Sequence, residues 1–171
     1  LSEFRGQKPV ALVFGSFTWP PYVKGTASLR ELYQNYSEQV QFLPIYIREA
    51  HPVDGWWMGG GILGKLTKKY SPATAFDVYD PQTIEERRLV AGQCEASLQY
   101  DIRTYVDNMD DSVSKAYAAK PTRLYLIGLD GLVKYAAGIG PYGFNPARLK
   151  QAIDVYLQHI SKPIIDNTGP M

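Results

Sequence analysis

Apolar residues along the chain fall into two patterns, short uninterrupted runs and single positions at helical spacing. Pro9 to Phe14 is an apolar run that ends at Gly15, which predicts a strand buried on both faces and hence a parallel sheet covered by helices. The run 41–47 predicts a second strand. Pro44 within this run makes its early part a weaker strand candidate or marks a bulge. Between the two, a helix is predicted from the spacing of Leu29, Leu32, Tyr33 and Tyr36.

The middle of the chain is less regular. Residues 48–80 include a run of three glycines at 59–61, and we expect a short helix through 63–70 and a strand at 75–79. Asp80 followed by Pro81 is typical of an N-cap and a first helical position, which predicts a helix start. The apolar side of that helix would turn Cys94 inward, together with Ile84, Ala91 and Leu98.

The last third predicts a strand at 102–106, a helix at 110–118 and a hairpin of strands 122–127 and 132–136 around the turn Asp130-Gly131. Asn145 caps a final helix, whose inner face is predicted to hold Leu149, Ile153, Tyr156, Leu157 and Ile160. The order of elements predicts an α/β thioredoxin-like fold, a central mixed sheet flanked by helices, with an insertion after the second strand.

Length and composition predict one domain. The 171 residues, 45% of them apolar, are enough for one core, so we expect a single domain over 1–171 with its core at about 8–160 and loose ends. A net charge of +1 makes nucleic acid a poor candidate partner. No apolar run reaches the roughly 18 to 20 residues that cross a bilayer. Because the chain starts at Leu1, the compartment stays open: we expect a soluble domain, with export or membrane association through a removed N-terminal segment as alternatives.

Composition also limits metal and cofactor chemistry. Cys94 is the single cysteine, which excludes an internal disulfide, a CxxC pair and a multi-cysteine zinc site. A metal site of His51, Glu49 and His159 is not favoured by their spacing. Residues 59–65 match the start of a phosphate-binding loop, but Leu66 replaces the required Ser or Thr, so we interpret them as a flexible glycine loop. We therefore expect no cofactor and no metal.

The junction between the first strand and the first helix, residues 14–22, is the leading candidate site. A thioredoxin-like fold places its redox motif there, because a helix N-terminus offers unpaired N–H groups and a positive dipole end that lower the pKa of a thiol or selenol. Pro121, just before a predicted strand, fits the second element of such a site, a proline that packs against the motif and is often cis. The alternative interpretation of Pro121 is a helix stop.

A family resemblance rests on this junction and on a second block. Residues 15–22 read Gly-Ser-Phe-Thr-Trp-Pro-Pro-Tyr and resemble the active-site segment Gly-Ser-Cys-Thr-Sec-Pro-Pro-Phe of the iodothyronine deiodinases. Residues 45–56, Ile-Tyr-Ile-Arg-Glu-Ala-His-Pro-Val-Asp-Gly-Trp, are similar to Ile-Tyr-Ile-Glu-Glu-Ala-His-Pro-Ser-Asp-Gly-Trp in that family. With shorter similar segments at 106–110, 116–117, 123–127 and 138–144, the resemblance to deiodinases and their bacterial relatives covers about residues 8–157 and implies a thioredoxin fold.

The redox positions differ from the family pattern. Trp19 stands at the selenocysteine position, Phe17 at that of the nearby cysteine, and Tyr22 where a CxxC motif would have its second cysteine. An indole has no titratable nucleophile, so the site as written cannot run the family's reaction. Two explanations stay open. Either this is a retired enzyme that serves as an accessory or interaction subunit of a larger assembly, or residue 19 is natively selenocysteine, whose codon UGA differs by one base from the Trp codon UGG, in a thiol- or selenol-dependent oxidoreductase.

The resemblance also implies roles for neighbouring residues. Thr18 belongs to the active-site segment, and Glu49 and His51 would lie near the pocket and handle a proton or a substrate phenol. Their alternative is a solvated loop after a strand. Cys94 would resolve the oxidised residue 19, and its alternative is a small apolar core residue. Arg48 replaces the first glutamate of the family pair, which changes the local charge.

Aromatic residues near the junction are candidates for a contact surface. They would line a cleft beside the site or form an interface with a protein partner, and they are Tyr22, Trp56, Trp57 and Tyr142. An open pocket bordered by Trp19, His51 and Pro121 would favour small-molecule chemistry. A filled pocket with a separate apolar surface would favour a protein partner.

Overall fold

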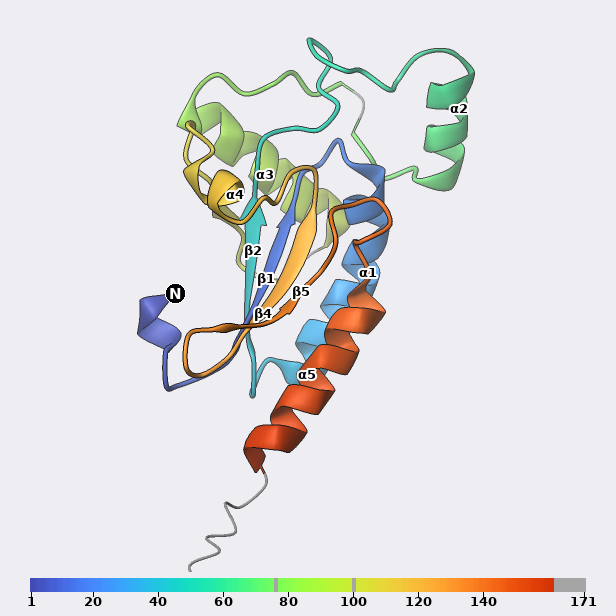
Figure 1. Ribbon diagram of the computed structural model, residues 1–171. Helices are drawn as coiled ribbons and strands as arrows, with labels where there is room; N and C mark the ends of the chain where they lie inside the picture. The colour runs from blue at the N-terminus through green and yellow to red at the C-terminus, as the bar shows by residue number, and fades with distance from the viewer. Residues whose placement is uncertain (76, 100, 162–171) are drawn as a thin grey trace, which may run out of the picture.

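The computed structural model describes residues 1–75, 77–99 and 101–161, and its centre is a five-stranded mixed sheet (Figure 1). Its order is β3-β2-β1-β4-β5. The β1–β2 and β2–β3 pairs are parallel, and the β1–β4 and β4–β5 pairs are antiparallel. The strands are β1 (Val10–Gly15), β2 (Gln41–Tyr46), β3 (Tyr105–Val106), β4 (Arg123–Ile127) and β5 (Val133–Ala136). The predicted thioredoxin-like α/β fold and its C-terminal hairpin are confirmed.

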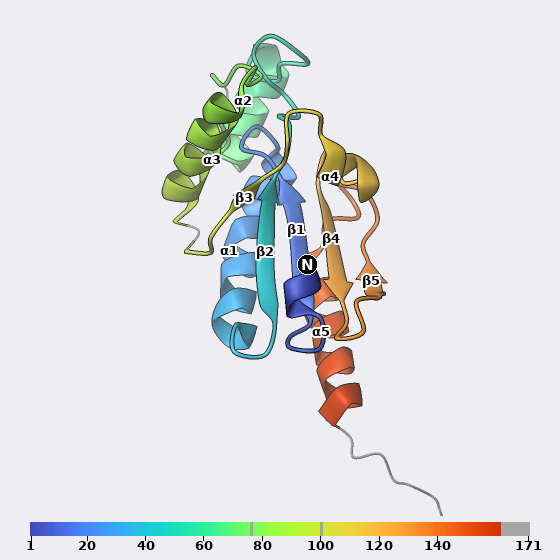
Figure 2. The same cartoon turned by 90° about the vertical axis from the view of Figure 1, so that its left-hand side faces the viewer.

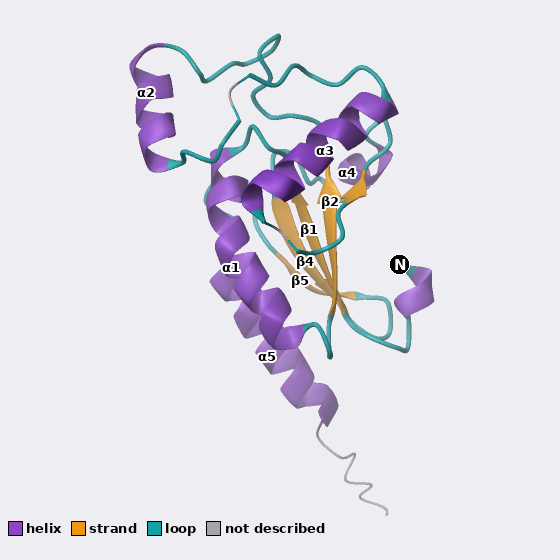
Figure 3. Ribbon diagram, turned by 180° about the vertical axis from the view of Figure 1, so that it is seen from behind, coloured by secondary structure: helices purple, strands orange, loops and turns teal. Residues whose placement is uncertain are grey.

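Helices cover the two faces of the sheet unequally (Figure 2 and Figure 3). One face carries α1 (Pro20–Tyr36), α3 (Ile84–Leu98) and α5 (Pro146–Ser161), which contribute buried residues such as Leu29, Cys94 and Ile153. Among the residues described, the other face carries only the short α4 (Ser112–Ala116) and η1 (Ser2–Phe4), over a second apolar cluster that includes Leu12 and Leu43. No helix in the described ranges is long and apolar enough to cross a bilayer.

The insertion lies between β2 and α3 and contains α2 (Gly61–Tyr70), which projects from the body of the molecule (Figure 1). This helix begins inside the glycine run, so the expected flexible loop over 59–65 is partly wrong. The expected strand at 75–79 is wrong for the residues that the structure describes, and Phe76 lies outside them. In its place, Ala75 N donates to Phe17 O (3.3 Å) and Val53 N donates to Val78 O (2.8 Å).

Pro44 neither shortens nor bulges β2, contrary to expectation. The strand is regular from Gln41, and Pro44 lies opposite Val13 of β1. On its other side β2 pairs with β3 only at Ile45 and Tyr46, so β2 is an edge strand where Pro44 occurs. A proline is tolerated there because no ladder hydrogen bond requires its missing N–H. The expected strand 102–106 is correspondingly reduced to the two residues of β3.

Two helix starts differ from the prediction for an identifiable reason. Helix α3 begins at Ile84 because Thr83 and Glu86 form a capping box, with Glu86 N donating to Thr83 Oγ1 (3.2 Å) and Thr83 N to Glu86 Oε2 (3.3 Å). Asp80 therefore does not cap this helix. Helix α4 is shorter than 110–118, and Asp107 stabilises its start by accepting from Val113 N (3.1 Å) and Ser114 N (2.8 Å).

The final helix begins as predicted, with Asn145 Oδ1 accepting from Arg148 N (3.2 Å). Leu149 and Ile153 are fully buried on its inner face. The prediction fails at the far end, where Ile160 is 40% exposed because the helix extends past the edge of the sheet (Figure 1).

Candidate functional site

Residue 19 lies at the start of α1, directly after the turn that follows β1. Trp19 is the N-cap residue, and Pro20 and Pro21 occupy the first helical positions. Proline fits there because its missing N–H would have no helical partner. Trp19 N donates to Ser16 O (3.2 Å), and Val23 N donates to Trp19 O (3.2 Å), so the backbone is held on both sides of the residue. The candidate segment therefore does lie at the strand-to-helix junction.

Glu49 joins this junction to the end of β2. Its buried carboxylate accepts at Oε2 from Thr18 N (3.0 Å) and Thr18 Oγ1 (2.6 Å), and the Tyr46 hydroxyl donates to Oε1. Thr18 Oγ1 in turn accepts from Ala50 N (3.1 Å) and His51 N (3.0 Å). The Thr18 hydroxyl thus uses its one donor and both acceptor sites. The alternative interpretation of Glu49 and His51, a solvated loop, is wrong, because both residues are buried.

Burial controls the acidity of this network. It raises the pKa of Glu49, although the hydrogen bonds from Thr18 and Tyr46 oppose the change. Burial, and then the Glu49 carboxylate, raise the pKa of Tyr46 well above its usual value. Tyr46 therefore remains a protonated donor, and its oxygen also accepts from Phe17 N (3.1 Å). Glu49 holds a proton more readily than an exposed glutamate, so it is the group in this network suited to proton uptake.

The rings of Trp19 and His51 stack, with centroids 5.3 Å apart and an interplanar angle of 29°. His51 Nδ1 lies 2.8 Å from Trp56 O. Since a carbonyl oxygen can only accept, Nδ1 carries the proton in the neutral ring and Nε2 is the bare nitrogen. Within the described ranges, neither His51 Nε2 nor Trp19 Nε1 has a hydrogen-bond partner, although both atoms are buried.

The neutral form of His51 is the favoured one. Burial lowers the pKa of its ring, and the positive charge of Lys120 lowers it further, against the opposing effect of the Trp56 carbonyl. A neutral His51 presents Nε2 as an acceptor. The site therefore offers an unused acceptor, His51 Nε2, and an unused donor, Trp19 Nε1, on two stacked rings.

The residue after Pro121 connects this segment to the surroundings of Trp19. The Lys120–Pro121 peptide bond is cis, as the redox-site interpretation predicted. Thr122 O accepts from Gly140 N (3.1 Å), and a Cβ added to Gly140 would lie 3.4 Å from Trp19 Nε1. The segment at Pro121 and the loop at Gly140 thus form one wall beside the indole.

Cys94 lies in the core, 3% exposed, in the same apolar cluster as Phe17 and Tyr46. Burial raises the pKa of its thiol strongly, and the charges of Glu49 and Glu95 raise it further. A thiol in this environment is a poor nucleophile because little of it is thiolate at neutral pH. The predicted inward orientation is confirmed, and a resolving role would require Cys94 to leave the core.

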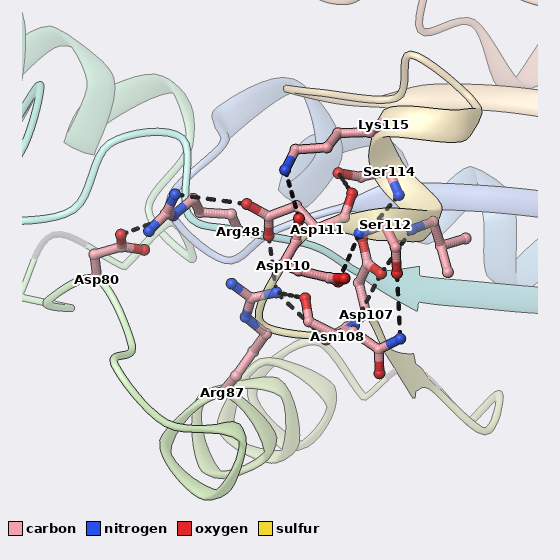
Figure 4. A network of polar contacts seen from close by, with 11 residues as sticks. Arg48, Asp80, Arg87, Asp107, Asn108, Asp110, Asp111, Ser112, Ser114 and Lys115 are labelled. Carbon is pink, nitrogen blue, oxygen red and sulfur yellow. Dashed lines mark hydrogen bonds and ion pairs between the residues drawn. The ribbon is translucent and has the colours of Figure 1, made fainter.

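Charged residues connect the ends of the insertion to α3 and α4 (Figure 4). Arg48 Nε lies 2.9 Å from Asp80 Oδ2, and Arg48 Nη1 lies 3.5 Å from Asp111 Oδ2. The fully buried Arg87 pairs with Asp111 Oδ1 (3.0 Å) and donates to Asn108 O (2.7 Å). The charge of Arg48, next to Glu49 in the chain, is therefore balanced by two carboxylates.

An apolar groove of about 600 Å³ lies on the outer side of Trp19, between the start of α1 and α2. Its walls include Trp19, Pro21, Met58, Tyr70 and Tyr142. Neither His51 nor Pro121 lines this groove, so it is not the open pocket bordered by Trp19, His51 and Pro121 that would favour small-molecule chemistry. Tyr22 is buried against Phe144 and does not contribute to the surface.

Two residues at the site were missed as individual candidates. Tyr46 occurs within one of the segments similar to the deiodinases, but no local signal distinguishes it from any other strand tyrosine. Arg87 occurs at helical spacing with Ala91 and Cys94, which could have indicated that it faces inward. His159 lies in the last turn of α5, and no metal-binding group of three His, Cys, Asp or Glu side chains is found among the residues described.

Comparisons with known proteins add a family context. The model of the family described as iodothyronine deiodinase matches residues 1–157. Thyroxine 5-deiodinase of Gallus gallus is 34% identical over 159 residues, which are 93% of this chain and 56% of that protein. The human thyroxine 5-deiodinase is 30% identical over 156 residues, 91% of this chain and 46% of that protein. The chain spans about half the length of the curated relatives that it matches.

Solved structures show the same fold at low identity. A putative thiol:disulfide interchange protein from Chlorobium tepidum superposes with a TM-score of 0.59 at 14% identity, over 91% of this chain and 84% of that one. A putative thioredoxin from Neisseria meningitidis superposes with a TM-score of 0.59 at 17% identity, over 94% of this chain and 81% of that one.

Proposed function

Because this chain belongs to the iodothyronine deiodinase family, we propose that it is a member without a redox nucleophile that serves as an accessory or interaction subunit of a larger assembly. The observation that carries the proposal is the state of residue 19. An indole stands at the nucleophile position and stacks on His51, the ring that would otherwise serve a reacting thiol or selenol. In this proposal the chain keeps the deiodinase scaffold, and a packed indole takes the place of the reactive group.

The remaining sulfur supports the same proposal. Cys94 is the single cysteine of the sequence, and burial with a raised pKa leaves it without appreciable thiolate. Covalent redox chemistry on sulfur or selenium requires an exposed nucleophile of lowered pKa. In this proposal Glu49, Thr18 and Tyr46 act as a structural link between two loops.

An activity assay tests the proposal directly. The chain as written, incubated with thyroxine and excess dithiothreitol, should release iodide no faster than dithiothreitol alone. Activity that follows the protein concentration and persists in a Cys94→Ala variant would overturn the proposal. Trp19→Cys in the Cys94→Ala background tests the remaining scaffold, and we expect its thiol to react with iodoacetamide near neutral pH faster than that of Tyr142→Cys, an exposed control in the same background.

A second function has one observation in its favour. The polar groups around residue 19 are retained, with Glu49 hydrogen-bonded to Thr18 and Tyr46, and His51 Nε2 left as an acceptor. An oxidoreductase with selenocysteine at residue 19 would use such groups for proton transfer, with Cys94 as a resolving thiol. The intact mass and selenium content of the native protein, together with the sequence of codon 19, distinguish the two functions. Selenium and a UGA codon would support the oxidoreductase. A UGG codon and the mass expected for Trp19 would support the accessory subunit.

A further inference from the structure

We propose that the exposed face of α2, together with Trp56 and Trp57, docks on a membrane surface that contains anionic lipid. We call this region the α2 surface. Its apolar members are largely exposed, and they are Trp56 (76%), Trp57 (48%), Ile62 (79%), Leu63 (56%), Leu66 (45%) and Tyr70 (62%). The proposal does not depend on the identity of residue 19, and hence not on the proposed function.

The geometry of α2 gives this surface an amphipathic form. At about 100° per residue, Ile62, Leu66, Tyr70 and Leu63 fall within one arc of roughly 100° on the helix. Thr67 and Gly64 fall outside that arc, and Gly64 is the buried residue of the helix. A Cβ at Gly64 would collide with the Gly59 backbone, so this side packs on the preceding loop. The apolar arc thus lies opposite the packed side of α2. Ile62 and Leu63 are exposed, and Leu66 and Tyr70 are also exposed while they line the groove toward the start of α1. Helix α2 itself projects from the body of the molecule (Figure 1, Figure 3).

Trp57 extends the apolar arc beyond the helix. Its indole packs over the backbone of Gly59 and Gly60, directly before the first turn of α2. Trp56, the preceding residue, lies on the side of the candidate site, where the centroid of its ring is 4.8 Å from the centroid of the His51 ring. Tryptophan is favoured at the boundary between water and lipid, because its ring is apolar and its N–H is polar. The two indoles thus have the chemistry of interfacial anchors.

Charge selects the occupant of this surface. Residues 55–75 contain three lysines, Lys65, Lys68 and Lys69, and no Asp or Glu, in a chain whose net charge is only +1. On the helix, Lys65 and Lys69 flank the apolar arc next to Ile62. Lys24 and Lys69 also lie 6.0 and 5.9 Å from the ring centroid of Tyr70.

Apolar side chains with flanking lysines match an anionic lipid surface, which attracts the lysines and takes up the apolar residues. A second copy of this chain is a poorer occupant. It would bring a second acid-free stretch against the first and oppose lysine to lysine.

Co-sedimentation with vesicles tests the proposal on the complete chain. We expect the chain to pellet with vesicles of equimolar phosphatidylcholine and phosphatidylglycerol, to pellet much less with phosphatidylcholine alone, and to be released by salt. Ile62→Glu should weaken partitioning at least about tenfold, because one apolar side chain is removed from the lipid. Lys65→Gln and Lys69→Gln should weaken it about fivefold each.

Matched controls separate this surface from general changes in charge or folding. Leu89→Glu introduces the same charge at a position of α3 that is 64% exposed, and it should leave partitioning unchanged. Circular dichroism checks that each variant is folded. Absence of pelleting, equal pelleting with both vesicle types, or equal loss for Ile62→Glu and Leu89→Glu would overturn the proposal. It would also be overturned if sedimentation showed a dimer that Ile62→Glu dissociates without any binding to vesicles.

Discussion

Removing one buried hydroxyl should expose the role of the network around Glu49. In Thr18→Val the side chain keeps its shape but loses three hydrogen bonds, one donated to Glu49 Oε2 and two accepted from Ala50 N and His51 N. The bond to a carboxylate is worth about 1.5–3 kcal/mol, and an orphaned buried N–H at His51 costs about 1–3 kcal/mol. Ala50 is half-buried, so water can replace its partner at little cost. We therefore expect the free energy of unfolding to fall by about 4 kcal/mol.

Equilibrium unfolding in urea, followed by circular dichroism, measures this loss, and thermal unfolding should show a fall of about 10 °C in Tm. Thr18→Ser, which keeps the hydroxyl, should lose only about 1 kcal/mol. Thr26→Val is a matched control, since Thr26 is also buried and its hydroxyl donates to Val23 O, one turn back in α1 (2.7 Å), instead of joining two loops. A loss in Thr18→Val no larger than in Thr26→Val would refute the reasoning.

Three further predictions concern single side chains. Cys94 should not react with Ellman's reagent in the native protein at mildly alkaline pH and should react once the chain is unfolded, because burial raises the pKa of its thiol; rapid native labelling would contradict its position in the core. The folded-state pKa of His51 is lowered, so the unfolded chain binds its proton more readily and the free energy of unfolding should fall as pH drops below about 6.5. His51→Gln should reduce that slope in pH-dependent denaturation, whereas His159→Gln, at an exposed position, should keep it. Arg87→Ala should lower the free energy of unfolding by about 3 kcal/mol or more, because it removes a buried ion pair with Asp111 Oδ1 and the hydrogen bonds to Asp107 O and Asn108 O, and the exposed Arg88→Ala should change it by less than about 0.5 kcal/mol in the same assay.

Local patterns predicted most of the elements, and they failed where a partner distant in sequence decides. The apolar run of β1, the hairpin and the Asn145 cap are local signals, and all three are present in the structure. Pro44 was misjudged because its tolerance depends on the short β3, some 60 residues later in the chain. The start of α3 was readable from the Thr83 and Glu86 spacing, but the stronger-looking Asp80-Pro81 pair was preferred.

The residues of the candidate site could be predicted from the sequence, but the hydrogen bonds and ring contacts between them could not. The resemblance brought Thr18, Trp19, Glu49 and His51 forward, and the structure brings these four together. Cys94 was placed correctly in the core, but the sequence did not separate a core cysteine from a resolving one. A buried arginine cannot be read from composition, because its burial depends on carbonyls that only tertiary structure brings to it.

The two ends of the insertion lie side by side. Arg48 and Asp80 form an ion pair of 2.9 Å, and Asp80 N donates to Asp54 Oδ1 (2.8 Å), so the segment that leaves the site after Asp54 returns at Asp80 to the place where it left. A loop closed in this way can change length at small entropic cost, because each doubling costs only about 0.6 kcal/mol. The part of the insertion beyond Asp54, which carries α2, is thus a module that evolution can lengthen or shorten while the sheet and the network at Glu49 stay in place.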